Sequence, residues 1–473
     1  MMRSLYSAVS GLKGHQTRMD VIGNNIANVN TTGFKSGRVN FEDMISQTLS
    51  SASSATDEIG GTNPKQIGLG VGVGSIDTLF TDGTTQSTGK NTDLALSGNG
   101  LFVVKKGSET YYTRDGAFQF DADGNYVLPS SGLYVQGWNA VDGVLTTNGA
   151  TENIVVQSGK SMSPEATGII TYANNLNAAM PTITSMSGGT TTTTTSGTST
   201  VTTYTASTTK PVILTMSDGT TVTETSGKYV VGQSLPVTTM VTAYDTLGNS
   251  HSIPIYFTKT KTDSTNGNSW TVSVNTDGSG SSTISEDDGT NTTVAMADAT
   301  INFTTSGKYN SGSPQTVTLT LTNGSEGTQT ITLNLQSLTQ FSGNSTINGT
   351  SDGHSAGTLS SVSIDSSGII TGTYTNGVKQ TEAQVAIAQF TNAAGLEKTG
   401  SSLYQTSNNS GTANVKTASD LGVTITPSAL EMSNVDISDE FTNMIVTQRG
   451  FQSNSKIITV DDELLETVIN MKR

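Results

Sequence analysis

The sequence predicts a mainly β protein with an α-helix at each end, and three observations lead to this prediction. Apolar residues repeat at heptad spacing near both termini, which is typical of helices packed on helices. Between the termini, short β-rich runs alternate with turns rich in Gly and Asp. Only 13% of the residues are charged and 33% are apolar, because Gly, Ser, Thr and Asn are abundant. Such a composition is typical of turn-rich β domains.

The composition also argues against several classes of function. The formal net charge of −15 disfavours nucleic-acid binding, which needs a basic surface. The chain has no Cys, so disulfides, thiolate metal sites and Cys nucleophiles are excluded. No apolar run approaches the roughly 18 residues that membrane insertion needs. The N-terminus does not have the pattern of a secretion signal, so we expect export without a cleaved signal peptide.

The first predicted helix lies at the N-terminus and carries a heptad seam as far as residue 26. The seam positions alternate in steps of four and three residues: Leu5, Val9, Leu12, Gln16, Met19, Gly23 and Ile26. The stretch NNIANVNTTGFKSG (residues 24–37) follows, and its Asn, Thr and Gly residues favour a helix C-cap and a loop. The residues alone leave open whether this stretch has a further role.

The second predicted helix covers the C-terminus and has the longer seam. Its positions are Ile437, Phe441, Met444, Gln448, Phe451, Ser455, Ile458, Asp462, Leu465 and Ile469. Ser438 is the predicted N-cap, with acidic residues in the first turn. The polar seam residues Gln448, Ser455 and Asp462 suit a helix that packs against several neighbours in an assembly. An antiparallel coiled coil within a monomer is the alternative.

The middle of the chain is predicted to be β. Two alternating runs around the turn NGSEG predict a hairpin: Val317, Leu319 and Leu321, then Ile331, Leu333 and Leu335. The segment DADGNYVLPSSG (residues 121–132) opens like a calcium loop but lacks its Gly and Glu, so a hairpin turn is predicted there. The Thr-rich residues 187–210 predict an exposed strand, a loop or the tip of an outer domain.

The sequence contains no recognisable catalytic constellation. His15, His251 and His354 lie far apart, and each is predicted to be a surface or turn residue. The Gly-rich residues 68–74 do not fit a dinucleotide-binding loop, because a strand rather than a helix follows them. We find no serine triad and no phosphate loop. We therefore expect no enzyme activity, no metal and no cofactor.

Both ends of the chain resemble the signature sequences of bacterial flagellar rod and hook proteins. The N-terminal string is NNIANVNTTGFK (residues 24–35), and the C-terminal string covers residues 433–456. The matching residues are Asn24, Asn25, Asn28, Asn30, Thr31, Gly33, Phe34, Lys35, Ser433, Asn434, Gln448, Arg449 and Asn454. The internal segments GNGLFVV, YTRDGAFQFDADGNYV, GLYVQGW and TAYDTLGNSH resemble hook proteins in particular. Residues 180–235 and about 260–355 match no pattern of the family.

The resemblance implies an architecture of paired N- and C-terminal coiled-coil helices that carry stacked β-rich domains. An outer domain is inserted into the inner one. The expected boundaries are an inner helical domain at 1–32 and 430–473, a connector at 33–70, an inner β domain at 71–175 and 356–429, and an outer Thr-, Ser- and Gly-rich domain at 176–355, as one domain or two.

The resemblance also implies a function, a structural subunit of the flagellar hook that forms a flexible helical tube and transmits torque from rod to filament. The implied partners are further copies of the chain, the rod, hook-cap and hook–filament junction proteins, and the type III export apparatus, with the hook outside the cell body. The expected assembly contacts are the apolar seam residues Leu5, Val9, Leu12, Met19, Ile26, Ile437, Phe441, Met444, Phe451, Ile458, Leu465 and Ile469. The alternatives are a distal-rod-like or hook-associated axial protein and, in a different class, a secreted Thr-rich adhesin.

Overall fold

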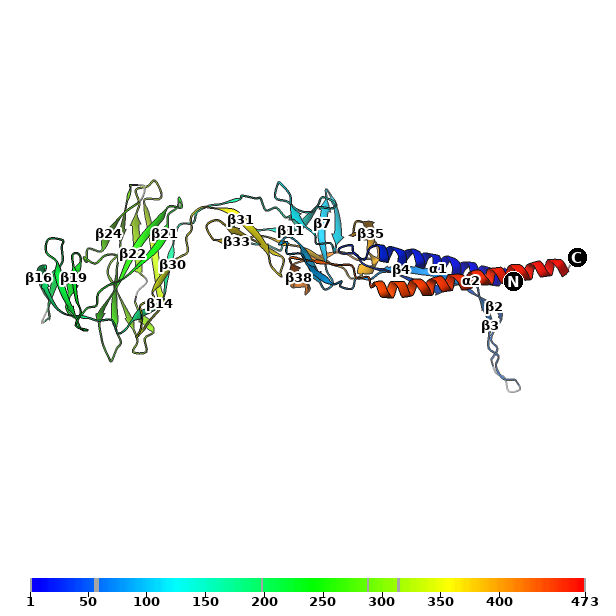
Figure 1. Cartoon of the computed structure of the whole chain (residues 1–473), viewed down its shortest axis with the longest axis horizontal. Helices are drawn as coiled ribbons and strands as arrows, with labels where there is room; N and C mark the ends of the chain where they lie inside the picture. Colours follow the sequence, from blue (N-terminus) through cyan, green and yellow to red (C-terminus); the bar gives the residue numbers. More distant parts are fainter. Residues whose placement is uncertain (1, 55–58, 197–198, 287–288, 313–314, 472–473) are drawn as a thin grey trace. The chain divides into compact units, whose positions relative to one another are not determined.

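Strands dominate the fold, and the two long helices lie at the ends of the chain (Figure 1). The structure is a computed structural model, and it describes residues 2–54, 59–196, 199–286, 289–312 and 315–471. The chain divides into two units. The first unit comprises residues 1–160, 359–374 and 379–473, and the second unit comprises residues 161–358 and 375–378. The predicted mainly β class, with terminal helices and one domain inserted into another, is confirmed.

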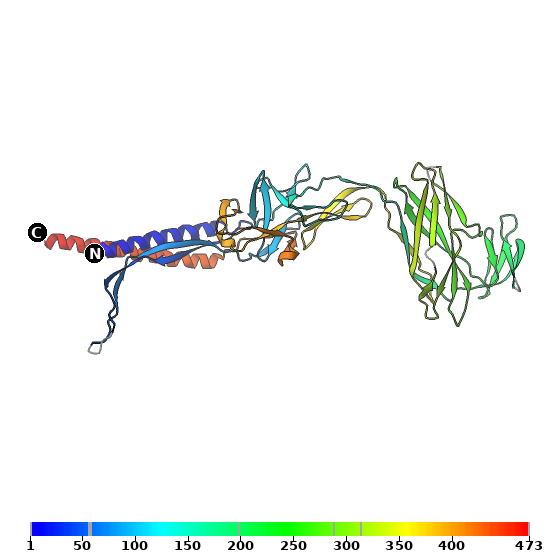
Figure 2. The same cartoon turned by 180° about the vertical axis from the view of Figure 1, so that it is seen from behind.

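The helices α1 (Met2–Ala27) and α2 (Ile437–Met471) lie side by side in the first unit and run in opposite directions (Figures 1 and 2). Asp436 caps α2, because its Oδ1 accepts hydrogen bonds from the backbone N–H groups of Ser438 and Asp439 at 2.8 and 3.4 Å. The N-cap predicted at Ser438 is therefore wrong, since α2 begins at Ile437 and Ser438 already lies inside it.

Short antiparallel pairs connect the helices to the main sheet of the first unit. Next to α1, β1 (Gly37–Asp43) pairs with β4 (Val71–Thr78), and the chain between them forms a ribbon of β2 (Ser46–Ser50) and β3 (Lys65–Gly68). Further on, N-terminal strands pair with C-terminal ones: β5 (Thr85–Ser87) with β39 (Ala429–Glu431), and β6 (Leu94–Ser97) with β38 (Thr424–Pro427). Both ends of the chain therefore build the same region.

The main sheet of the first unit also mixes strands from both parts of the chain. Its order is β31 (Gly357–Ile364), β32 (Ile369–Tyr374), β33 (Lys379–Val385), β11 (Leu133–Asn139), β7 (Leu101–Lys106), β8 (Glu109–Thr113), β36 (Leu403–Gln405) and β35 (Glu397–Gly400). Shorter elements join it or flank it: β9 (Gln119–Phe120), β10 (Tyr126–Leu128), β12 (Glu152–Asn153), β34 (Ile387–Gln389), β37 (Asn414–Lys416), and the 3₁₀ turns η1 (Ala393–Gly395) and η2 (Ser419–Leu421). β9 and β10 form the hairpin predicted around residues 121–132, with Asp121 Oδ1 accepting from the backbone of Asp123 and Asn125.

Two packed sheets form most of the second unit. One sheet has the order β21 (Val237–Tyr244), β22 (Ser250–Lys261), β23 (Ser269–Ser273), β26 (Ala299–Phe303) and β27 (Tyr309–Ser311). The other has the order β24 (Ser281–Ser285), β25 (Asn291–Ala295), β28 (Gln315–Thr320), β29 (Thr328–Phe341), β14 (Ile169–Asn177) and β30 (Asn348–Ser351). Alternate side chains of both sheets meet in one core around Trp270 and Phe257, as in a β-sandwich. The hairpin predicted at residues 317–335 is confirmed, because Val317 pairs with Ile331.

A smaller part of the second unit contains the Thr-rich segment. Its two sheets have the orders β15 (Ile183–Gly188), β18 (Val212–Met216), β19 (Thr221–Glu224), and β16 (Thr190–Ser196), β17 (Ser199–Thr205), β20 (Lys228–Val230). Along β16 and β17 the cross-strand partners are mostly Thr, as in Thr192 with Thr203 and Thr193 with Thr202. Of the predicted options, the segment is thus a strand pair, and Thr191 to Thr195 are exposed.

The second unit begins earlier than the expected outer domain at 176–355. β14 starts at Ile169 and runs parallel to β29, so residues expected in the inner β domain belong to the sandwich. Before it, β13 (Ser161–Met162) pairs with residues 357 and 358. Sequence patterns did not reveal the parallel pairing of β14 with β29, because these two strands are far apart in the chain.

Candidate functional site: the terminal helices and their joint

The interface between α1 and α2 is built mostly from small and polar residues, and it includes the buried Ile22. Ala8 and Gly11 of α1 are buried. A Cβ atom at Gly11 would lie 2.5 Å from Asn454 Nδ2, and one at Gly450 would lie 2.7 Å from the His15 ring. The helices therefore approach closely where side chains are absent. Burial and the neighbouring Arg18 lower the pKa of His15, which favours its neutral form.

Hydrogen bonds between side chains cross the same interface. Arg18 Nη2 donates to Asn443 Oδ1 at 3.0 Å, and Asn25 Nδ2 donates to Glu440 Oε1 at 2.8 Å. Thr447 of α2 is fully buried. Net contributions of such bonds are modest, about 0.5–1.5 kcal/mol each. The helix pair of one chain is thus held mainly by polar contacts and close packing rather than by an apolar seam.

The expected assembly residues lie next to this interface rather than in it. On α2, Ile437, Phe441, Phe451 and Ile469 are 42–65% exposed. The remaining expected residues are half-buried: Met444, Ile458 and Leu465 on α2, and Leu5, Val9, Leu12, Met19 and Ile26 on α1. The polar positions Gln448, Ser455 and Asp462 are exposed. In both helices the contact surface lies one residue before the predicted seam, because the heptad period identifies parallel stripes but not which stripe faces the partner helix.

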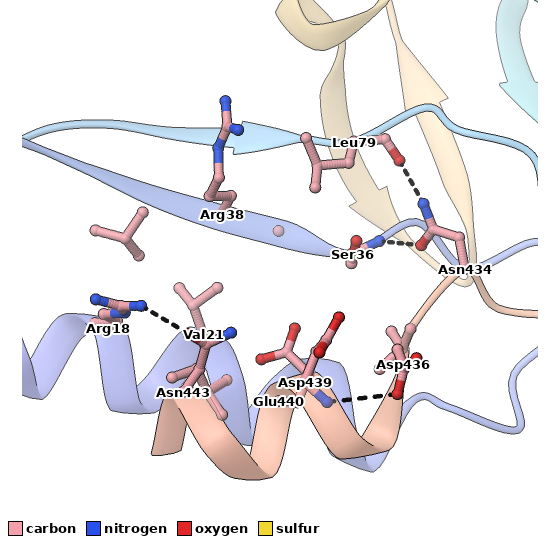
Figure 3. Close-up of a pocket in the computed structure, with 14 residues that line it drawn as sticks. Arg18, Val21, Ser36, Arg38, Leu79, Asn434, Asp436, Asp439, Glu440 and Asn443 are labelled. Atoms are coloured by element: carbon pink, nitrogen blue, oxygen red, sulfur yellow. Dashed lines mark hydrogen bonds between the residues drawn. The ribbon is translucent and has the colours of Figure 1, made fainter. Parts of the chain in front are cut away.

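The end of α1 and the chain that follows the family string form a joint with the segment before α2, where Ser36 and Leu79 bond to Asn434 (Figure 3). Asn25 Nδ2 donates to Gly37 O, and Gly37 N–H donates back to Asn25 Oδ1, both at 2.9 Å. Ser36 N–H donates to Asn434 Oδ1 at 2.8 Å, and Asn434 Nδ2 donates to Leu79 O at 2.8 Å. A cavity of about 260 Å³ lies beside these bonds, between α1, β1 and the start of α2. Asn25 of the N-terminal string and Asn434 of the C-terminal string therefore hold the joint together, beyond any role in capping a helix.

A buried charge cluster lies deeper in the joint. Lys35 Nζ contacts Glu431 Oε1 and donates to Thr81 O, each at 2.6 Å. Arg114 Nη1 contacts the other oxygen of Glu431 at 3.0 Å, and Asp82 Oδ1 at 3.4 Å. The side chains of Lys35, Arg114 and Glu431 are fully buried. Burial lowers the pKa of Lys35, and Arg114 lowers it further, whereas the pairing with Glu431 opposes the shift.

Sequence reasoning named Lys35 as a motif residue but missed Arg114 and Glu431. Glu431 lies on β39, two residues before the C-terminal string. Its carboxylate contacts both cations. Arg114 was present in the quoted segment YTRDGAFQFDADGNYV, where a basic residue before an Asp-Gly turn gives no sign of burial. The expected start of the helical domain at residue 430 also differs from the structure, since residues 429–431 form a strand of the β region.

The other motif residues divide between the joint and the helix surfaces. Gly33 has a φ of +64°, and a Cβ there would lie 2.4 Å from the backbone N of Asp115, so only Gly fits this turn. The Phe34 ring lies 5.0 Å from Lys398 Nζ. Asn28, Thr31 and Asn24 bond among themselves at the end of α1, while Asn30 is exposed. Ser433 Oγ accepts from Val435 N–H at 3.3 Å; Asn454 faces Gly11, and Gln448 and Arg449 are exposed on α2.

The histidines do not form a catalytic site with one another. His251 is 2% exposed, so its prediction as a surface or turn residue is wrong: it lies on β22, with Asp245 Oδ2 at 3.4 Å and Glu286 Oε1 at 2.8 Å. Among the described residues, no group of three or more His, Asp or Glu side chains is arranged to hold a metal ion. Within the same residues, neither helix has the length and apolar character to cross a bilayer.

Models of flagellar protein families match four segments of the chain. Residues 5–35 match the flagella basal body rod protein, and residues 426–471 match the flagellar basal body rod FlgEFG protein C-terminal model. Residues 95–172 match the flagellar hook protein FlgE/F/G D1 domain, and residues 231–354 match the flagellar basal body protein FlaE D2 domain. The two terminal matches coincide with the helices and the joint described above.

Full-length relatives agree with these matches. The flagellar hook protein FlgE of Treponema pallidum is 39% identical and that of Borreliella burgdorferi is 38% identical, each over 100% of both chains. The flagellar basal-body rod protein FlgG of Bacillus subtilis is 30% identical, also over 100% of both chains. Because the hook proteins match at higher identity and over the whole length, this chain belongs to the flagellar hook protein FlgE family.

Proposed function

We propose that this chain is the structural subunit of the flagellar hook, and that its copies polymerise into a flexible helical tube that transmits torque from rod to filament. The observation that supports this most directly is the apolar stripe of α2, which includes Phe441 and Phe451. It is exposed on the single chain, and contiguous apolar surface that is exposed commonly marks a protein interface. Further copies of the chain would cover it.

The proposed architecture assigns different tasks to different parts of the chain. The helices, within 1–32 and 430–473, form the inner layer, and residues 33–70 form the connector to the β region. The connector has exposed apolar side chains, Ile45 at 84% and Ile59 at 71%, which suits contact with adjacent subunits. The joint around Glu431 fixes the helices to the β region, so that force on one is carried to the other.

The hook must bend while it rotates, so each row of subunits lengthens and shortens once per turn. The second unit exposes hydroxyl side chains with few charges, such as the Thr residues of β16 and β17. Surfaces of this kind exchange hydrogen bonds and bridging waters at small net cost, about 0.5–1.5 kcal/mol per bond. We infer that subunits slide past each other in the outer layer while the helices hold the inner layer.

The role is proposed to be structural and not enzymatic. The partners are proposed to be other copies of the chain, the rod, the hook-cap and hook–filament junction proteins, and the type III export apparatus, which would export the chain to the outside of the cell body without a cleaved signal peptide. A distal rod subunit is the second candidate, favoured by the full-length match to the rod protein FlgG.

Electron microscopy of cells that produce variants of this chain tests the proposal. Deletion of residues 1–35 should give basal bodies that end at the rod, with neither hook nor filament. Because this deletion removes the whole of α1, the double substitution Phe441→Ser and Phe451→Ser is the sharper variant: the chain should reach the medium but form no hook. Thr442→Ala, an exposed neighbour on α2, is the matched control. Hooks on cells with the double variant would overturn the proposal, and loss of the rod instead would favour the second candidate.

A further inference from the structure

The charges of α2 are separated along its length. Residues 441–460 contain two exposed basic residues, Arg449 and Lys456, and no acidic residue. Residues 461–471 contain Asp461, Asp462, Glu463 and Glu466 and no basic residue. Lys472 and Arg473 follow in the sequence and lie outside the described residues. We call residues 441–460 the middle segment and residues 462–471 the end segment.

The end segment has little cover within the chain. Facing residues of the antiparallel pair, Asn25 with Glu440 and Gly11 with Asn454, have numbers that add up to 465, so Met2 at the start of α1 lies level with Glu463. About eight residues of α2 therefore extend beyond α1, or ~12 Å at the helical rise. Figures 1 and 2 show the end of α2 extending past the start of α1.

Exposed apolar residues accompany both charge groups. On the end segment Leu464, Val468 and Ile469 are 48, 44 and 65% exposed. On the middle segment Phe451 and Ile457 are 42 and 44% exposed. The exposed face of α1 also has basic residues, Arg3 and Lys13, but Tyr6 is its only large exposed apolar residue among those described. The middle segment thus has charges opposite to those of the end segment, and both segments expose apolar side chains.

We propose that the end segment of α2 docks on the middle segment of α2 in a neighbouring copy, and that this charge pattern sets the axial shift between the two copies. The proposal rests on the proposed hook function. Copies in register would place acidic residues beside acidic ones. A shift of ten residues sets Glu466 level with Lys456, and a shift of fourteen sets Glu463 level with Arg449. An intermediate shift of about twelve residues, ~18 Å, brings both acids within one turn of a basic residue.

A shifted contact of this kind has the symmetry that a polymer needs. The two copies use different surfaces, so each copy keeps a free end segment on one side and a free middle segment on the other. Such heterologous contacts repeat without closing and generate open helical filaments. A contact in register would instead be self-complementary and could stop at a dimer.

Reciprocal charge reversal tests the proposal in cells whose only copy of the chain is the variant. One variant carries Glu463→Lys and Glu466→Lys, the second carries Arg449→Glu and Lys456→Glu, and the third combines all four substitutions. The first two should each reduce the number of hooks roughly tenfold or more, since they bring like charges together. The combined variant should restore hooks, because opposite charges face each other again.

Two further measurements keep the outcomes distinct. The amount of exported chain in the medium and the fluorescence of Trp138 in the first unit show whether each variant is exported and folded. A matched control combines Glu463→Lys and Glu466→Lys with Arg3→Glu and Lys13→Glu, and it should not restore hooks. Normal hooks with the first or the second variant would overturn the proposal. It would also be overturned if the combined variant were exported and folded but formed no hooks, or if the control with Arg3→Glu and Lys13→Glu restored hooks. Absence of any hook with the unaltered chain would contradict the hook function itself.

Discussion

At the residue scale, the joint depends on one carboxylate that serves two buried cations. Glu431 contacts Lys35 through one oxygen and Arg114 through the other, and all three side chains are fully buried. Removal of one partner from a buried ion pair leaves an uncompensated charge, which is far more costly than losing a surface pair. Loss of Glu431 should therefore destabilise the first unit strongly.

We expect Glu431→Ala to lower the free energy of unfolding of the first unit by about 3–5 kcal/mol. The chain has two Trp residues, Trp138 in the first unit and Trp270 in the second, so urea unfolding of a Trp270→Phe background follows the first unit alone. Glu397→Ala, at an exposed carboxylate on β35, is the control and should change the free energy by less than about 1 kcal/mol. Equal effects of the two substitutions would show that the buried cluster does not stabilise the joint.

A second residue-scale prediction concerns Asp245 in the second unit. Burial alone would raise the pKa of Asp245, but hydrogen bonds from Asn249, Asn323 and His251 outweigh burial and hold this pKa below its ordinary value. Because the folded state favours the ionised carboxylate of Asp245, this group stabilises the fold at pH values above about 3.9, the pKa of Asp in an unfolded chain. This stabilisation is lost as the pH falls and the carboxylate becomes protonated. The urea midpoint reported by Trp270 should therefore fall between about pH 6 and pH 3, and Asp245→Asn should have a lower midpoint and a shallower slope. An unchanged slope would contradict the assignment.

At the element scale, the effect of a C-terminal truncation depends on whether it removes α2 alone or β39 as well. Residues 429–431 form β39, which pairs with β5, and Asn434 bonds to the backbone beside β4. Removal of residues 436–473 deletes α2 but keeps these contacts. Removal of residues 430–473 also deletes Glu431, so that Lys35 and Arg114 lose their carboxylate.

We expect both truncated chains to lack polymer, because each has lost the apolar stripe of α2. Only the longer truncation should lower the urea midpoint of the first unit, measured through Trp138. Electron microscopy of the purified chains checks the first expectation and fluorescence checks the second. Identical midpoints for the two truncations would mean that β39 and Glu431 do not support the β region.

Elements near one another in the sequence could be predicted, and those built from distant segments could not. The hairpin around NGSEG follows from alternation and a turn, both of which are local signals. The parallel pairing of β14 with β29 and the cluster of Lys35, Arg114 and Glu431 join segments up to 396 residues apart, and no local pattern reveals them. The heptad spacing predicted both terminal helices, yet the contact surface lies one stripe away, where Gly11 and Gly450 permit close approach.

At the scale of the whole molecule, the chain leaves the first unit after Lys160 and returns to it at Leu359, and these two residues are neighbours. Leu359 N–H donates to Lys160 O at 2.9 Å, and both residues belong to the first unit. The outgoing and returning segments therefore lie side by side where the chain leaves the first unit, and the pairing of β13 with β31 continues this contact through residues 161–162 and 357–358. Insertions with adjacent ends are the ones that a fold tolerates best.

The adjacency of these two segments makes the second unit a replaceable module in evolutionary terms. A recombination event that exchanges residues 163–356 for another self-contained domain would keep β13 and β31, and with them the strand order of the main sheet, in place.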